Sequence, residues 1–304
     1  MKPPSCSEVV VVGLVRNCGS TVRATVARLS RALAGFQSVR WFLVESDSSD
    51  DSVEALDRLS LSVPEFRYVS LGKLRKTHRH RVERIARCRN RYLEELENNS
   101  IYKSTDYVVM ADFDGLNTRI NRDAIESCWS GREWSGCFAN QVGHYYDIWA
   151  LRHPLWSPND CWEVSRFMES VGESRRVSRK RGAFSRMIRI SPDSSWIEVD
   201  SAFGGLAIYE SSAIRGLRYT FSTVDGRGVC EHVPFNEKIG IGNGKLYINP
   251  RLINAGLTDH YAQSLIFGSF LVAVGRKLDN IRFFTRRVVS LVQRRVKASQ
   301  RKSA

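Results

Sequence analysis

Short, uniformly apolar runs alternate with amphipathic stretches through the first part of the chain. Each run ends in polar or turn-forming residues, which is typical of a strand buried on both faces. The runs predict four strands, at residues 9–15, 39–44, 66–71 and 107–111. The stretches between them have apolar residues at helical spacing and predict helices at 21–34, up to 59 and at 77–96. This alternation predicts a doubly wound, mostly parallel α/β sheet with helices on both faces.

The second half of the chain has a mixed pattern. It predicts a strand at 137–140, a polar and basic region of helices and loops over 155–195, and two strands around a glycine turn within 196–209. A helix then begins near residue 230 and a last strand covers 245–250. We expect one α/β domain over 1–262 and a C-terminal basic helical tail over 263–304.

Net charge and cysteine usage narrow the class of protein. The chain carries a formal charge of +14, concentrated in a block from Lys73 to Arg91 and in the tail from Arg276 onward. Basic blocks favour phosphate-bearing partners or anionic membranes, although solvated helix faces explain each block equally simply. The seven cysteines show no metal-site or disulfide spacing, and no apolar stretch is long enough to span a membrane. We therefore expect a cytoplasmic protein.

Two carboxylates follow the fourth predicted strand. Asp112 and Asp114 are two residues apart, so an extended chain directs both toward the same side. They lie at the carboxyl end of a strand, where open α/β sheets bind ligands. A divalent cation such as Mn²⁺ or Mg²⁺, with a phosphate on its far side, relieves the repulsion between them. The alternative is a turn in which one carboxylate caps and the other is solvated.

An ordered set of short motifs carries a resemblance to a known family. The set consists of Arg16-Asn17, Glu45-Ser-Asp47, Arg89-Asn90, Asp112-Phe-Asp114, Gly204-Gly205 and Glu231. In this order the motifs resemble glycosyltransferases of the GT-A fold over roughly residues 8–260. The blocks around Gly204-Gly205, Glu231 and Asn249-Pro250 also look like those of capsule-associated mannosyltransferases. Neither a dinucleotide-binding glycine motif nor a P-loop motif occurs.

The resemblance implies a nucleotide-binding half over about 8–118 and an acceptor half over about 119–262. It implies a UDP- or GDP-linked sugar donor, a Mn²⁺ or Mg²⁺ cofactor, and transfer of a mannose-, glucose- or galactose-type hexose to a glycan or lipid-linked acceptor. The donor contacts would be Arg16, Glu45, Asp47, Arg89, Asn90, Asp112, Gly204 and Gly205. The metal ligands would be Asp112, Asp114 and His260, with His232 competing with His260.

Two further observations concern the helix before the Asp pair and the acceptor side. Arg89 shares the apolar face of its predicted helix, so we expect it to turn toward the sheet. Tyr145, Tyr146 and Trp149 are candidates for an acceptor-stacking platform or for the core.

The resemblance also implies a catalytic carboxylate. Glu231 is the first candidate and Asp200 the second, either as a base or as the group that stabilises an oxocarbenium-like centre. The simpler interpretation of Glu231 is a carboxylate in the first turn of a helix. The chain has Glu231-His232 where the large inverting family has Glu-Asp, and it lacks that family's later Gln-x-x-Arg-Trp motif. Stereochemistry therefore stays open.

Apolar residues at helical spacing over 281–296, with arginines between them, predict a basic amphipathic helix. Such a helix either lies on an anionic membrane surface or packs on the protein core. An anionic membrane is therefore a candidate partner through residues 276–304, and a packed C-terminal helix is the alternative. Two rival functions are a nucleotidyltransferase on a similar sheet and a basic nucleic-acid-binding protein. A nucleotidyltransferase would need a glycine-rich loop after the first strand, and the sequence does not have one. Nucleic-acid binding would leave the acidic residues unexplained. Nucleic acid is therefore disfavoured as a partner.

Overall fold

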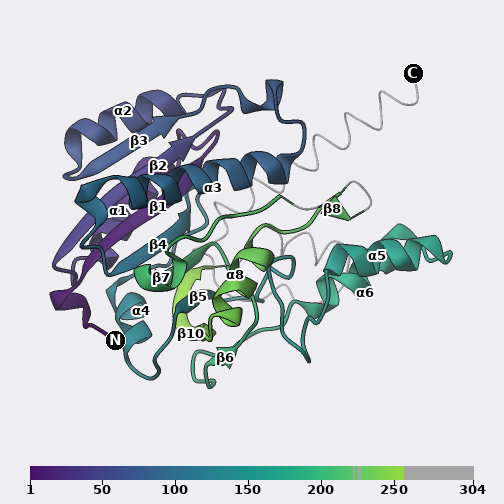
Figure 1. Cartoon of the computed structure of the whole chain (residues 1–304). Coiled ribbons are helices and arrows are strands. Elements are labelled where there is room, and N and C mark those ends of the chain that lie inside the picture. The colour runs from purple at the N-terminus through teal and green to yellow at the C-terminus, as the bar shows by residue number, and fades with distance from the viewer. Residues whose placement is uncertain (222, 225–226, 257–304) are drawn as a thin grey trace, which may run out of the picture. The chain divides into compact units, whose positions relative to one another are not determined.

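The computed structural model describes residues 1–221, 223–224 and 227–256 (Figure 1). The strands are β1 Glu8–Val15, β2 Ser38–Glu45, β3 Phe66–Ser70, β4 Tyr107–Asp112, β5 Gly136–Gln141, β6 Ile197–Glu198, β7 Leu206–Glu210, β8 Thr223–Val224, β9 Arg227–Gly228 and β10 Leu246–Ala255. The helices are α1 Val22–Ala32, α2 Ser52–Ser62, α3 Arg81–Asn98, α4 Arg122–Glu126, α5 Cys161–Ser170, α6 Arg175–Gly182, α7 Ser211–Ile214 and α8 His232–Ile241. His260 and the tail at 263–304 lie outside the described residues.

Eight strands form one sheet in the order β3-β2-β1-β4-β7-β5-β10-β6. The pairs among β1, β2, β3 and β4 and the pair of β5 with β10 are parallel. Strand β7 runs antiparallel between β4 and β5, and β6 is an antiparallel edge. The predicted α/β class and mostly parallel sheet are therefore confirmed.

Both faces of the sheet are covered. Val10 and Val12 of β1 are buried in one apolar cluster together with residues of α3, and Val9 and Val11 are buried in a second cluster with residues of α1 and α2. Because successive side chains of a strand point to opposite faces, this division explains why the strand runs are apolar at every position.

Some boundaries differ from the sequence-based expectation. Helix α3 begins at Arg81, four residues later than predicted, and β10 continues past Pro250 to Ala255. The pairing of β10 with β5 shifts register between Ile248 and Ile253, which accommodates the proline. Thr21 does not cap α1: its hydroxyl donates to the Phe113 carbonyl (2.7 Å) instead. Among the described helices, none is both long and apolar enough to cross a bilayer.

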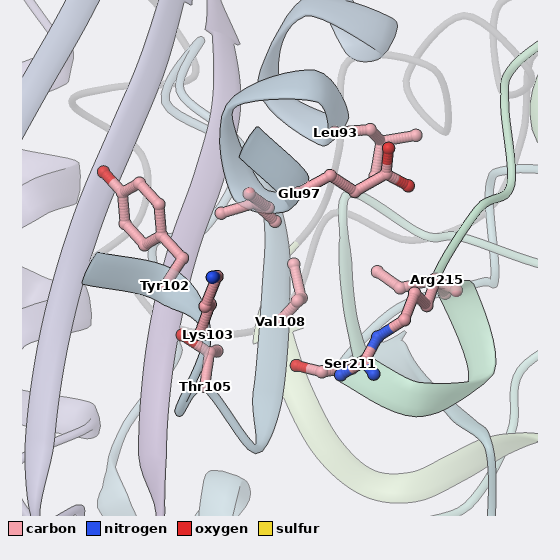
Figure 2. Close-up of a pocket in the computed structure, with 10 residues that line it drawn as sticks. Leu93, Glu97, Tyr102, Lys103, Thr105, Val108, Ser211 and Arg215 are labelled. Atoms are coloured by element: carbon pink, nitrogen blue, oxygen red, sulfur yellow. The ribbon is translucent and has the colours of Figure 1, made fainter. Parts of the chain in front are cut away.

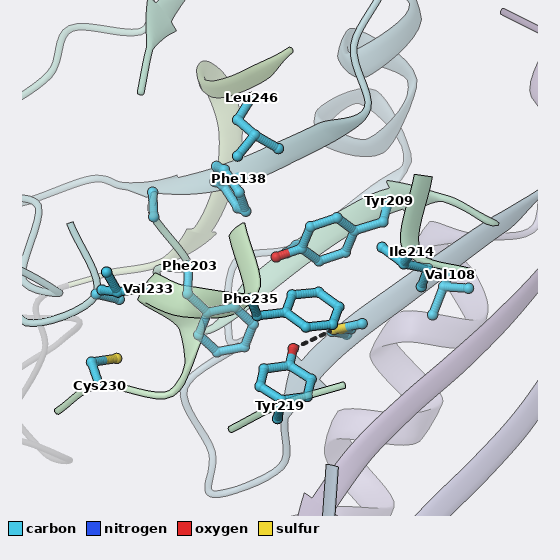
Figure 3. Close-up of a cluster of buried hydrophobic side chains, with 14 of the residues drawn as sticks. Val108, Phe138, Phe203, Tyr209, Ile214, Tyr219, Cys230, Val233, Phe235 and Leu246 are labelled. Atoms are coloured by element: carbon cyan, nitrogen blue, oxygen red, sulfur yellow. Dashed lines mark hydrogen bonds between the residues drawn. The ribbon is translucent and has the colours of Figure 1, made fainter. Parts of the chain in front are cut away.

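A cluster of aromatic side chains supports the middle of the sheet beside α8 (Figure 3). The rings of Tyr219 and Phe235 stack at 4.1 Å between centroids, and the Tyr219 hydroxyl donates to the Met110 sulfur at 3.1 Å. Phe203 and Tyr209 complete the cluster. This packing fixes the segments that precede and follow the glycine turn.

The glycine turn before β7 requires glycine. Gly204 and Gly205 have φ values of 71° and 83°, in the left-handed region that a Cβ disfavours. A Cβ on Gly204 would also lie 2.8 Å from the Ala139 carbonyl oxygen. Gly216 has a similar φ of 74° but open space around it.

We expect Gly204→Ala to destabilise the fold by about 1–3 kcal/mol more than Gly216→Ala, because only the former adds a backbone clash. Urea unfolding of the two variants measures the difference. Equal losses would mean that the backbone around Ala139 relaxes without cost.

Candidate active site

A cavity of about 590 Å³ opens at the carboxyl ends of β1 and β4. Five acidic residues line it: Asp47, Asp112, Asp114, Asp147 and Glu231. Five arginines line it as well: Arg16, Arg81, Arg84, Arg89 and Arg179. An anionic ligand that is bound through a cation needs both charges: carboxylates hold the cation, and arginines contact the anion.

The loop that carries the Asp pair is held by backbone contacts. Phe113 is buried beneath it, and the space is so tight that a Cβ on Gly13 would lie 2.4 Å from the Phe113 ring. The Asp112 amide donates to the Gly205 carbonyl (3.0 Å), and the Asn117 side chain donates to the Asp112 carbonyl (2.8 Å). These contacts leave Asp112 half-buried and Asp114 exposed at the cavity.

The Asp112 carboxyl lies in a strongly acidic environment. Burial, the largest cause, and the Asp114, Asp147 and Glu231 carboxylates together raise its pKa to about 8, and Arg89 opposes the shift. Such crowding fits a hard divalent cation, which takes carboxylate oxygens and removes the repulsion. In the part of the chain that the structure describes, no three side chains are placed to hold an ion by themselves. Phosphate and water oxygens would therefore complete the shell, as Mg²⁺ and Mn²⁺ commonly require.

Asp147 is a cavity residue that the sequence did not single out. Its carboxylate accepts from the Gly204 amide (3.1 Å) and, more weakly, from the Ala150 amide (3.4 Å). These bonds aim the side chain from the 145–149 segment toward the Asp pair. No local motif marks this aspartate, because its neighbours in space come from the glycine turn.

Arg89 and Glu231 form a buried ion pair at the back of the cavity. The Arg89 Nε donates to Glu231 Oε1 at 3.1 Å, and both side chains are less than a tenth exposed. The guanidinium also donates to the Tyr92 hydroxyl (3.2 Å) and lies against the rings of Phe203 and Tyr219 at 5.2 and 5.3 Å. The prediction that Arg89 turns inward from α3 is confirmed.

His232 follows Glu231 and is buried in the same wall. Its ring stacks on Phe203 at 4.0 Å, and neither ring nitrogen has a hydrogen-bond partner within the described residues. Burial lowers the pKa of His232 well below its ordinary value, and Arg89 lowers it further. The imidazole is therefore neutral in the folded protein.

We expect this histidine to make the fold acid-sensitive. The unfolded side chain takes up a proton near pH 6.5 and the folded one does not, so the contribution of this histidine to stability falls as the pH drops through that value. At pH 5.5 the loss amounts to about 1.4 kcal/mol relative to neutral pH, and His232→Leu should remove it. Urea unfolding at pH 7.5 and 5.5 tests this, with the exposed His80→Leu as control. Equal pH slopes for wild type and His232→Leu would contradict it.

The predicted donor residues on the first two strands divide into two groups. Arg16 lies at the cavity after β1. Asp47 is also there, held at a φ of 60° and paired with Arg84 (3.4 Å) and Arg75 (3.6 Å). Glu45 is not at the cavity: it is buried and accepts from the Ser48 amide at 2.9 Å.

Four other predicted residues lie away from the cavity lining: Asn90, Asp200, Gly204 and Gly205. The Asn90 side chain bonds both backbone groups of Tyr219, at 2.8 and 2.9 Å, and so fastens α3 to the segment before β8. Asp200 is exposed on the connection between β6 and β7. Gly204 and Gly205 support the Asp loop through backbone bonds rather than by lining the cavity.

Aromatic side chains also line the cavity. Tyr146 and Trp149 line it, whereas Tyr145 belongs to the core. Helices α5 and α6 with the turn after them add Trp162 and Phe184, whose rings meet edge to face at 6.3 Å. The sequence predicted a polar and basic region of helices and loops here, but it did not show which of its residues reach the cavity.

A second cavity, of about 510 Å³, lies at the opposite end of β4 (Figure 2). Leu93 and Val108 contribute to an apolar lining, and Glu97 is paired with Arg218 at 2.5 Å. Among the described residues that line this cavity there is no second carboxylate, so the candidate chemistry belongs to the first cavity.

The chain is therefore an α/β protein with an open, mostly parallel sheet and an Asp-x-Asp pair at the carboxyl end of a central strand. No protein-family model and no curated protein matches the chain. Among solved structures, it is similar to a mannosyltransferase from Pyrobaculum calidifontis in complex with GDP-mannose and Mn²⁺, at 13% identity and a TM-score of 0.46 over 84% of this chain and 58% of that one.

Two further similarities are of the same kind. TarS from S. aureus in complex with UDP-GlcNAc is 9% identical, with a TM-score of 0.49 over 87% of this chain and 62% of that one. Glucosyl-3-phosphoglycerate synthase from Mycobacterium tuberculosis in complex with UDP is 12% identical, with a TM-score of 0.41 over 93% and 78%. The chain thus spans about three fifths of the first two proteins.

Proposed function

We propose that the protein is a metal-dependent glycosyltransferase that moves a hexose from a nucleotide-sugar to a glycan or lipid-linked acceptor. The observation that carries this proposal is the convergence of Asp112, Asp114, Asp147 and Glu231 with Arg89 in one cavity at the carboxyl edge of the sheet. A purely structural acidic cluster would not be expected to open onto a cavity lined by arginines and aromatic rings.

The chain's own residues have separate roles in this proposal. Asp114, the exposed member of the pair, ligates Mn²⁺ or Mg²⁺ directly, and Asp112 contacts the ribose or the metal's water shell. Arg16 and Arg84 lie at the rim where the donor's phosphates would bind. His260 stays a candidate metal ligand outside the described residues. When bound, the cation supplies charge neutralisation of the diphosphate leaving group.

The catalytic carboxylate is Glu231 in this proposal. Arg89 fixes its orientation through the 3.1 Å bond, so it faces the cavity in one geometry. There it accepts the acceptor hydroxyl's proton or stabilises positive charge on the sugar carbon. The aromatic side chains of Tyr146, Trp149 and Trp162 provide faces on which the acceptor stacks. Asp200, exposed and outside the cavity lining, is the weaker candidate.

A thermal-shift panel tests the proposal. The wild-type protein is heated with UDP-, GDP-, CMP- and dTDP-sugars, each with and without Mn²⁺. A ligand that binds the folded state raises the melting temperature by mass action, so one nucleotide-sugar should raise it only when the metal is present. Shifts with nucleoside triphosphates alone would favour a nucleotidyltransferase. No shift with any nucleotide, together with salt-sensitive binding to random DNA, would favour the nucleic-acid-binding alternative.

A further inference from the structure

Helices α5 and α6, with the turns on either side of them, form a lobe that we call the outer lobe, residues 155–189 (Figure 1). The two helices pack on each other. Asp160 caps α5 through the amides of Trp162 and Glu163, and Ser174 caps α6. The outer lobe is thus an ordered unit with a defined surface.

That surface is unusually apolar. Four of the eight large apolar side chains that are exposed in the described residues belong to it: Leu155 (91% exposed), Phe167 (65%), Val171 (65%) and Ile188 (44%). Phe167 and Val171 are four residues apart at the end of α5, so they lie on one face. Apolar side chains gathered in this way indicate a surface that is covered by something else.

The same lobe is strongly basic. Residues 155–189 contain eight Lys and Arg against one Asp and three Glu. Arg181 pairs with Glu173 at 2.9 Å, and Arg179 lies over the Trp162 ring. Arg175, Arg176 and Lys180 are exposed, with no ion-pair partner in the described part of the chain. These three charges are available to an anionic surface.

The outer lobe is also a wall of the catalytic cavity. Trp162 and Arg179 line that cavity, whereas Phe167 and Val171 lie farther along the lobe. From Trp162 to Val171 the chain advances about 14 Å along the helix direction. A surface that covers Phe167 and Val171 therefore lies within about 14 Å of Trp162, a residue that lines the cavity.

We propose that the outer lobe docks the protein on an anionic lipid bilayer and so brings the cavity to a membrane-borne acceptor. Aliphatic and aromatic side chains enter the interface while neighbouring arginines contact lipid phosphates, as in basic amphipathic elements. A second copy of the chain fits less well, because two basic lobes repel. The acceptor part of this proposal rests on the proposed function, whereas the docking itself does not.

Vesicle flotation of the full chain, without nucleotide or metal, tests the docking. We expect binding to vesicles that contain phosphatidylglycerol and little binding to phosphatidylcholine alone. Phe167→Ser with Val171→Ser should weaken binding roughly tenfold or more through lost apolar burial. Arg175→Gln with Arg176→Gln should weaken it roughly 25-fold, since each charge near the surface contributes about a factor of five.

Matched controls share exposure and chemistry but lie on other helices. Leu61→Ser (89% exposed) and Ile241→Ser (83% exposed) match the apolar pair, and Arg23→Gln with Arg31→Gln on α1 matches the charge pair. We expect the controls to bind within about twofold of wild type. Melting temperatures show that each variant is folded.

Two results would overturn the docking proposal. The first is no binding of wild type to anionic vesicles. The second is equal vesicle binding by the lobe variants and wild type. If those variants had also lost binding to single-stranded nucleic acid, the lobe would be a nucleic-acid surface; if not, any membrane contact would lie elsewhere, such as the basic tail at 276–304. Because no donor is present, none of these results depends on whether the protein transfers sugars.

Discussion

Asp114→Ala should abolish the metal-dependent thermal shift with the preferred nucleotide-sugar and lower transfer activity by about 10²–10³-fold. The physical reason is that Asp114 is the exposed carboxylate of the pair and, in the proposed function, the direct ligand of the cation. Without it, the donor's diphosphate would face Asp112, Asp147 and Glu231 with less positive charge between them. The melting temperature of the ligand-free variant should stay close to that of wild type, because an exposed side chain is lost.

Asp193→Ala is the matched control, since Asp193 is an exposed aspartate outside the cavity lining. It should keep both the shift and the activity. If Asp114→Ala responds like wild type, Asp112 and Asp114 do not bind the donor and only form a turn. Isothermal titration with Mn²⁺ plus donor, and then with each alone, separates loss of metal binding from loss of donor binding.

Arg89→Met should destabilise the protein by about 3–5 kcal/mol, because it leaves the Glu231 carboxylate buried without its partner. The variant also loses the hydrogen bond to the Tyr92 hydroxyl and the contacts with the rings of Phe203 and Tyr219. Chemical denaturation at neutral pH measures the free energy of unfolding.

The double variant Arg89→Met, Glu231→Gln should lose less stability than the sum of the single variants, since no unpaired charge is left buried. Arg122→Met is a control that breaks the exposed pair with Glu126 on α4, and it should cost only about 0.3–0.5 kcal/mol. Strict additivity in the double variant would mean that Arg89 and Glu231 act on stability independently.

Local patterns predicted much of the sheet and part of the site. The apolar runs marked β1 to β4 because each strand is buried on both faces, and their polar ends placed Arg16, Asp47 and the Asp pair at one edge. The helical spacing also identified Arg89 as the inward arginine of α3. In each of these cases the pattern that predicts the position lies within a single strand or helix.

Residues whose position depends on distant segments were not predictable in this way. Asp147 faces the Asp pair because the Gly204 amide holds it, and nothing near it in the sequence reports that bond. Glu45 ends the strand that Asp47 follows, yet its carboxylate accepts from the Ser70 hydroxyl at the end of β3 and lies away from the cavity. Asn90 neighbours Arg89 but its amide is used by the Tyr219 backbone. Hydrogen bonds to segments distant in the sequence determine the positions of all three side chains.

The antiparallel strand β7 lies between β4 and β5, and its position affects how the chain can fold during synthesis. When β4 has left the ribosome, one of its edges has no partner until β7 follows, from Asp112 to Leu206 along the chain. At ordinary elongation rates that interval lasts about 5–20 s. A fully apolar strand with an open edge is prone to aggregation during such a delay. Newly made chains should therefore depend on chaperones, and slower translation between β4 and β7 should lower the yield of folded protein.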